Sequence, residues 1–177
     1  MRSKLAEGNA DISDNIVPAS EIISEMIKLT NEVSGDFSFY TAGLQFQGLA
    51  YKEMGLNDAS YFRQAINVLE KVADLHVSKN YFEDAAYDLY MLSSVYSRSG
   101  DNEKAITTLQ QALENDRKAE NSWGLAADWL AIAKIQKKMK NLESAEVSCK
   151  RSLEIAKASF LTEAINDAQS FLDSFEK

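Results

Sequence analysis

The chain has 177 residues, of which 45% are apolar and 26% are charged, and its net charge is −8. This apolar content is enough for a folded core and too high for a disordered chain. The acidic balance argues against nucleic acid as the main partner, because phosphate would be repelled. With one proline and seven glycines, the composition favours an all-helical protein.

The sequence also bears on the compartment. No apolar run approaches the roughly 20 residues of a membrane span, and the first residues lack the apolar core of a signal peptide. The single cysteine cannot form an internal disulfide, which fits a reducing compartment. We therefore expect a cytoplasmic protein.

The N-terminal region divides into a tail and a first helix. Residues 1–17 are small and polar, and we expect them to be disordered. Pro18 suits the first turn of a helix over 18–34, which Ser34, Gly35 and Asp36 would end. A single domain is expected from 18 to 177.

Apolar residues at helical spacing predict three helix pairs after this point, at 37–75, 81–118 and 122–157, followed by one helix at 160–175. The first pair looks like a divergent copy of the repeat described below, which would make Gly48 its small contact residue and Leu56 to Ser60 an insertion. That insertion means either an early helix start or an enlarged turn. Asp101 and Asn141 are placed to cap the helices that follow them.

The middle of the chain contains one pattern twice, with every position 40 residues after its counterpart. The first copy reads Leu89, Leu92, Ser93, Tyr96, Gly100, Asp101, Ala105, Leu109, Ala112 and Leu113. The second reads Trp129, Ile132, Ala133, Gln136, Lys140, Asn141, Ala145, Cys149, Ser152 and Leu153. A repeat of this size indicates a stacked array, in which each unit buries its apolar side against its neighbour.

This pattern resembles the tetratricopeptide repeat, from which Gln136 and Lys140 depart where Tyr and Gly are expected. The resemblance implies a right-handed superhelix (a solenoid) of about eight antiparallel helices, with 160–175 as the solubilising terminal helix. The stretch Ala145 to Lys157 is similar to the longer repeats of kinesin light chains and cell-polarity adaptors.

The resemblance further implies a concave groove lined by the first helix of each unit. Its predicted residues are Gln45, Phe46, Leu49, Lys52 and Glu53; Tyr87, Tyr90, Met91, Ser94, Ser97 and Arg98; and Ala127, Leu130, Lys134, Lys137 and Lys138. The aromatic residues and Met91 could anchor apolar side chains, and the five cations would attract an acidic or carboxylate-bearing segment. The alternative is that the lysines are ordinary surface residues and that Tyr90 and Met91 pack against the next pair. The groove lacks the residues of the chaperone-type carboxylate clamp.

No residue set suggests catalysis, a metal or a cofactor, so we expect a protein that is not an enzyme. His76 is expected to be a surface or loop-packing histidine, and Cys149 a buried, inert thiol. Trp129 is expected in the core, and Trp123 is expected to pack against the preceding pair rather than to form an exposed contact.

These observations predict a protein-binding adaptor or scaffold that holds a partner's peptide segment in its groove. One alternative is a self-assembling structural module, suggested by Phe160, Phe171 and Phe175. Another is a regulatory or sensor domain.

Overall fold

A computed structural model describes residues 19–175, and over that range the protein is all-α. The eight described helices are α1 (Ala19–Glu32), α2 (Phe37–Met54), α3 (Ser60–Ser78), α4 (Phe82–Ser99), α5 (Asn102–Lys118), α6 (Ser122–Lys138), α7 (Leu142–Ala158) and α8 (Thr162–Asp173). The predicted fold class and helix order are confirmed. The expected disordered tail at 1–17 lies outside the described residues.

The chain separates into two compact units, and the boundary, between Gly43 and Leu44, falls inside α2. In the first unit, a β-carbon at Gly43 would meet the side chain of Thr30, so α1 and the start of α2 approach closely. Asp36 precedes α2 and accepts a hydrogen bond from the backbone N–H of Phe39 at 3.2 Å. This carboxylate satisfies a backbone donor that the helix itself leaves free.

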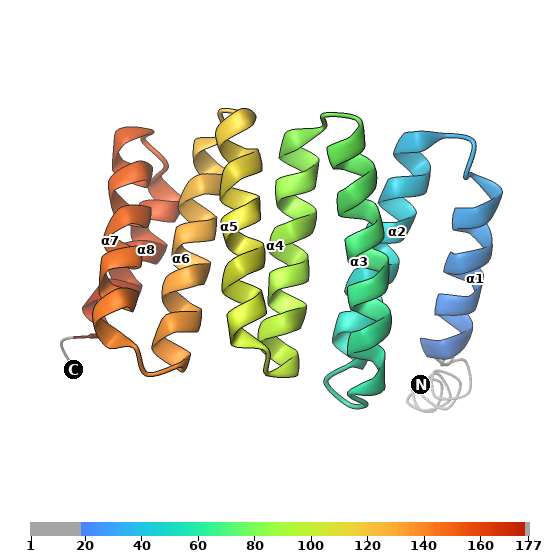
Figure 1. The fold of residues 1–177 in the computed structure, drawn as a ribbon, viewed down its shortest axis with the longest axis horizontal. Helices are drawn as coiled ribbons and strands as arrows, with labels where there is room; N and C mark the ends of the chain where they lie inside the picture. The colour runs from blue at the N-terminus through green and yellow to red at the C-terminus, as the bar shows by residue number, and fades with distance from the viewer. Residues whose placement is uncertain (1–18, 176–177) are drawn as a thin grey trace, which may run out of the picture. The chain divides into compact units, whose positions relative to one another are not determined.

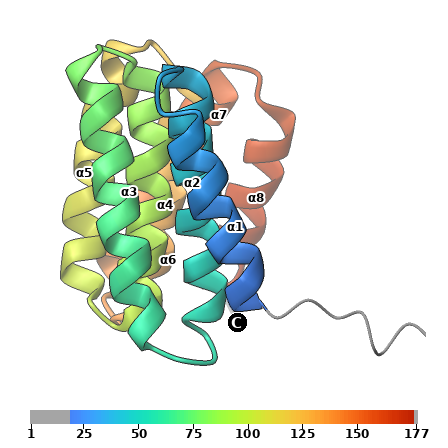
Figure 2. The ribbon, with the colours of Figure 1, turned by 90° about the vertical axis from the view of Figure 1, so that its right-hand side faces the viewer.

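In the second unit, α3 to α8 follow one another in a row, and each contacts the next (Figure 1). Further contacts join α4 to α6 and α6 to α8. Viewed along the row, α3 and α5 lie on one side of α4 and α6 (Figure 2). Alternate helices therefore form two layers, as expected for stacked helix pairs.

The turns of this unit repeat every 20 residues. The left-handed backbone conformation occurs at Asn80 (φ 59°), Gly100 (97°), Glu120 (55°), Lys140 (64°) and Phe160 (57°). At each turn the N–H of the following residue donates to the carbonyl five residues earlier, at 2.9–3.0 Å. This is the hydrogen bond that closes a helix C-terminus in the Schellman motif.

The helix starts are less uniform. The side chains of Asp101 and Asn121 accept hydrogen bonds from the backbone N–H of Lys104 and Gly124, respectively. Asn141 has the same position before α7 but makes no such bond, so the predicted cap is wrong there. The expected insertion is an enlarged turn, since residues 55–59 join α2 to α3 where residues 100–101 join α4 to α5.

The core runs between the layers. Ala105, Leu109 and Leu113 of α5 pack with Ile132 and Ile135 of α6. Further along, Leu130 and Ala133 pack with Cys149 and Leu153 of α7 and Ala168 of α8. A β-carbon at Gly48 would collide with Leu69, so Gly48 is the small contact that the sequence predicts.

Candidate functional site

The predicted groove residues lie on α2, α4 and α6, and they divide by exposure. Phe46 (63% exposed), Tyr87 and Tyr90 are open to solvent. Met91 is only 4% exposed and Leu130 only 7% exposed, so both are core residues rather than exposed anchors. Leu49, Ser94 and Ala127 are half-buried, whereas Arg98 is exposed.

A cavity of about 470 Å³ opens between α4 and α6, and we call it the acidic pocket. Its lining consists of Gln45, Glu83, Asp84, Ala86, Tyr87, Tyr90, Asp116, Asn121, Trp123, Gly124, Ala127 and Asp128. The groove prediction included Gln45, Tyr87, Tyr90 and Ala127 but missed the four carboxylates and Trp123. Trp123 is 57% exposed, so the expectation that it packs against the preceding helix pair is wrong.

A second cavity of about 160 Å³ lies next to the first, because both are lined by Tyr90, Trp123 and Ala127. It is also lined by Ala126, Leu130, Ala131, Lys134, Ser152, Glu163, Ala164 and Asp167. These two neighbouring cavities, lined mainly by α4, α6 and α8, are together called the α4–α6 groove.

The five predicted cations do not gather in this groove. Lys134 lines it, whereas Lys52 lies 3.3 Å from the carboxylate of its neighbour Glu53. Lys138 donates from Nζ to the carbonyl oxygen of Ser97 at 2.5 Å.

The side chain of Lys137 contacts the C-terminal end of α8 instead of the groove. Its Nζ donates to the carbonyl and hydroxyl oxygens of Ser174 at 3.1 and 2.6 Å, and lies 4.3 Å from the ring centre of Phe175. The ammonium group therefore caps the end of α8, where the helix dipole is negative.

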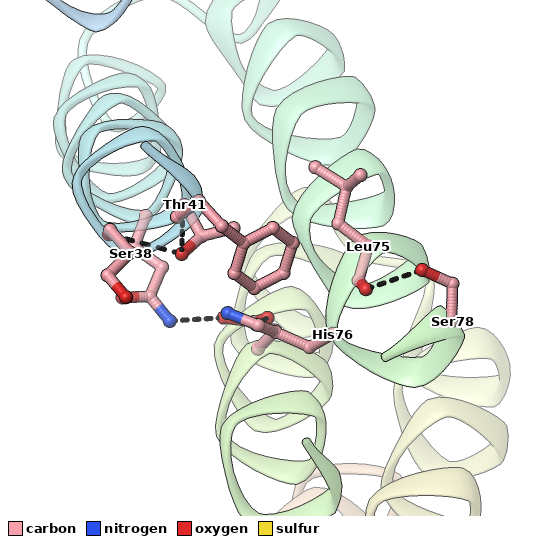
Figure 3. Close-up of polar contacts among 8 residues, drawn as sticks. Ser38, Thr41, Leu75, His76 and Ser78 are labelled. Atoms are coloured by element: carbon pink, nitrogen blue, oxygen red, sulfur yellow. Dashed lines mark hydrogen bonds and ion pairs between the residues drawn. The ribbon is translucent and has the colours of Figure 1, made fainter. Parts of the chain in front are cut away.

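Three buried aspartates line or border the acidic pocket, and their surroundings differ. Asp88 is closely paired: it accepts a hydrogen bond from Nε2 of Gln45 at 2.7 Å, and its other oxygen lies 2.6 Å from Nδ1 of His76. Figure 3 shows His76 on α3 beside these contacts. Loss of hydration still raises the pKa of Asp88, although both hydrogen bonds oppose the rise.

His76 itself is only 4% exposed and belongs to α3, so the expectation of a surface or loop-packing histidine is wrong. A buried aspartate on α4 gives it a structural partner.

The other two aspartates form a pair. Asp116 accepts a hydrogen bond from Nδ2 of Asn121 at 2.9 Å and shares a hydrogen bond with Asp128. Burial, with the neighbouring negative charge, raises the pKa of Asp128 to about 9, and burial raises that of Asp116 to about 6. At neutral pH the two carboxyl groups therefore hold one proton between them.

Gly124 makes this arrangement possible, because a β-carbon at that position would collide with the carboxylate of Asp116. A sequence signal for the buried acids did exist. Asp88 and Asp128 are 40 residues apart, so they occupy equivalent positions in the two repeats. Neither aspartate occupies one of the apolar or turn positions that define the repeat.

Cys149 is fully buried on α7 and donates from Sγ to the carbonyl oxygen of Ala168 at 3.2 Å. Burial raises the pKa of this thiol, which makes it a poor nucleophile. Within residues 19–175, no group of three or more His, Cys, Asp or Glu side chains is placed to hold a metal ion. No helix in the same range combines the length and apolar character needed to cross a membrane.

Comparison with known proteins identifies the repeats. A family model described as tetratricopeptide repeat matches residues 89–118 and 129–159. This family is a repeat module rather than a catalytic domain. A search of the curated proteins finds no match to the chain. Residues 89–159, which span most of α4 to α7, therefore carry two tetratricopeptide repeats, a general protein-interaction module.

Proposed function

We propose that this protein is an adaptor that holds a peptide segment of a partner protein in the α4–α6 groove. The observation that carries the proposal is that two neighbouring cavities share Tyr90, Trp123 and Ala127, so together they offer an extended surface over α4, α6 and α8. Tyr87, Tyr90 and Trp123 are exposed there. Exposed aromatic rings on rigid helices are the kind of anchor that protein interfaces use.

The 40-residue period supports the longer type of repeat, similar to that of kinesin light chains. The free thiol of Cys149 is in keeping with a cytoplasmic location, which is part of this proposal.

Self-assembly through the C-terminal helix has less support. Phe171 and Phe175 pack edge to face at 5.4 Å, and Lys137 covers both rings. Of the three phenylalanines that suggested this alternative, Phe160 is the exposed one. We therefore favour the groove over the C-terminal helix as the interaction surface.

The test compares capture of cellular proteins by the full chain and by two variants of it. Tyr90→Ala with Trp123→Ala removes two groove rings, and Phe160→Ala with Val147→Ala removes two exposed apolar side chains outside it. We expect a partner whose recovery, measured by quantitative mass spectrometry, falls with the groove variant and not with the control. Equal recovery of every captured protein with the full chain and both variants would show that the groove is not the binding surface.

A further inference from the structure

The acidic pocket has an unbalanced charge. Glu83, Asp84, Asp116 and Asp128 line it, and its described lining contains no Lys or Arg. Within the described part of the chain, none of these four carboxylates forms an ion pair with a basic side chain. Although Asp116 and Asp128 hold one proton between them at neutral pH, the pocket keeps a net negative charge, and such charge in a concave site with low-dielectric walls attracts a cation.

Asp128 supplies an independent sign that a ligand group is expected. Its side chain lines the pocket but is only 2% exposed. Its Oδ2 atom has no hydrogen-bond partner among the described residues. Because Asp128 shares a proton with Asp116 at neutral pH, a bound ammonium or guanidinium group would favour its ionised form and would supply a hydrogen-bond donor to Oδ2.

The aromatic residues complete the site for an organic cation. Tyr87, Tyr90 and Trp123 line the same cavity and are exposed to different extents. Ammonium and guanidinium groups bind to the faces of such rings as well as to carboxylates. The volume of about 470 Å³ lies within the range of ligand pockets.

We propose that the acidic pocket binds the ammonium or guanidinium group of a basic side chain in a peptide. This inference rests on the proposed function, because the rest of the peptide would lie along the α4–α6 groove toward Leu130 and Ala164. It changes the charge expected of the partner, since five predicted groove cations had suggested an acidic segment. The pocket selects for a Lys or Arg side chain at one position of the bound segment.

The experiment selects random linear peptides on the full chain, then measures their affinities by calorimetry and by the fluorescence of the tryptophans. We expect Lys or Arg to be enriched at one position. Replacing that residue with norleucine or citrulline should weaken binding roughly tenfold or more, as expected for a hydrogen-bonded charge.

Two protein variants localise the effect. Glu83→Gln with Asp84→Asn removes two exposed carboxylates of the pocket, and Glu103→Gln with Glu143→Gln removes two exposed first-turn carboxylates of α5 and α7. Both pairs change the net charge equally. The preference for a basic residue should fall several-fold in the pocket variant and change by less than about twofold in the control.

Three outcomes are decisive. If peptides bind through Tyr90 and Trp123 but show no basic preference, the proposed function stands and this inference is overturned. If no peptide depends on the groove, the proposed function fails, and agmatine then tests the pocket alone. Agmatine binding that the pocket variant loses would assign the pocket to free amines instead of peptides, and absence of agmatine binding would overturn the inference altogether.

Discussion

The buried aspartates show how one residue type can serve different roles at equivalent positions of a repeat. Asp88 has two side-chain hydrogen-bond partners, Gln45 and His76, one at each oxygen of its carboxyl group. Asp128 is its counterpart 40 residues later, but it faces another carboxyl group. Both carboxyl oxygens of Asp88 therefore have a hydrogen-bond partner, whereas Oδ2 of Asp128 has none among the described residues.

The Asp116–Asp128 pair predicts how stability depends on pH. Because the folded pKa of Asp128 is raised to about 9, the folded protein binds more protons than the unfolded chain between about pH 4 and pH 9. The contribution of this pair to stability is therefore present at low pH and is lost as pH rises through that window. Asp116, with a pKa of about 6, acts in the same direction.

Asp128→Asn should abolish much of this loss of stability with rising pH, because the amide N–H still donates a hydrogen bond to Asp116 but does not ionise. We expect the free energy of unfolding of the variant to rise relative to the parent by at least about 1 kcal/mol between about pH 5 and pH 8.5. Urea denaturation at the two pH values measures it. Parallel behaviour of the two proteins would show that the pair does not share a proton.

At the scale of the elements, the turns are more regular than the helices they join. Left-handed residues recur every 20 positions from Asn80 to Phe160, although only one of the five is glycine. Asn is tolerated in this conformation, but Glu120, Lys140 and Phe160 carry a steric cost. The Schellman hydrogen bond closes each turn despite that cost.

Phe160→Gly tests this cost where packing contributes least, since Phe160 is 89% exposed. Glycine relieves the left-handed strain, so we expect the free energy of unfolding to rise by about 0.5–1 kcal/mol. The matched control is Ser159→Gly, one residue earlier, where φ is −103° and glycine should destabilise. A loss of stability in both variants would mean that the backbone at Phe160 is unstrained.

In the second unit as a whole, we expect the local stability of each helix to depend on how many other helices contact it. Helix α8 contacts α7 and α6 and covers the buried thiol of Cys149. Within residues 19–175 no other helix contacts α8, and a helix with few neighbours opens locally at lower free energy than one packed on both sides. The reactivity of Cys149 should therefore report the opening of α8.

Phe171→Ala should accelerate labelling of Cys149 by a thiol-reactive dye about tenfold, because it removes a half-buried ring that packs against the cluster around Cys149. Phe82→Ala, which removes a half-buried ring at the start of α4, should have a much smaller effect. Stopped-flow absorbance under native conditions gives the rates. Equal acceleration by both variants would indicate global unfolding instead of local opening of α8.

Much of the fold could be predicted because helical periodicity, turn residues and the 40-residue repeat are local properties of the chain. They place most helix boundaries correctly, along with the buried position of Cys149 and the close contact at Gly48. The groove could be predicted only in part. Tyr87, Tyr90 and Ala127 line it, whereas Met91 belongs to the core.

The sequence alone determined which segments are helical and that they stack as repeats, because each residue's periodic position is set by its near neighbours. Only the tertiary structure decided the charge of the groove. Lys137 and Lys138 find partners 37 and 41 residues away, and Asp116 meets Asp128 across two helices. Such contacts depend on how neighbouring helices align, which no local pattern specifies.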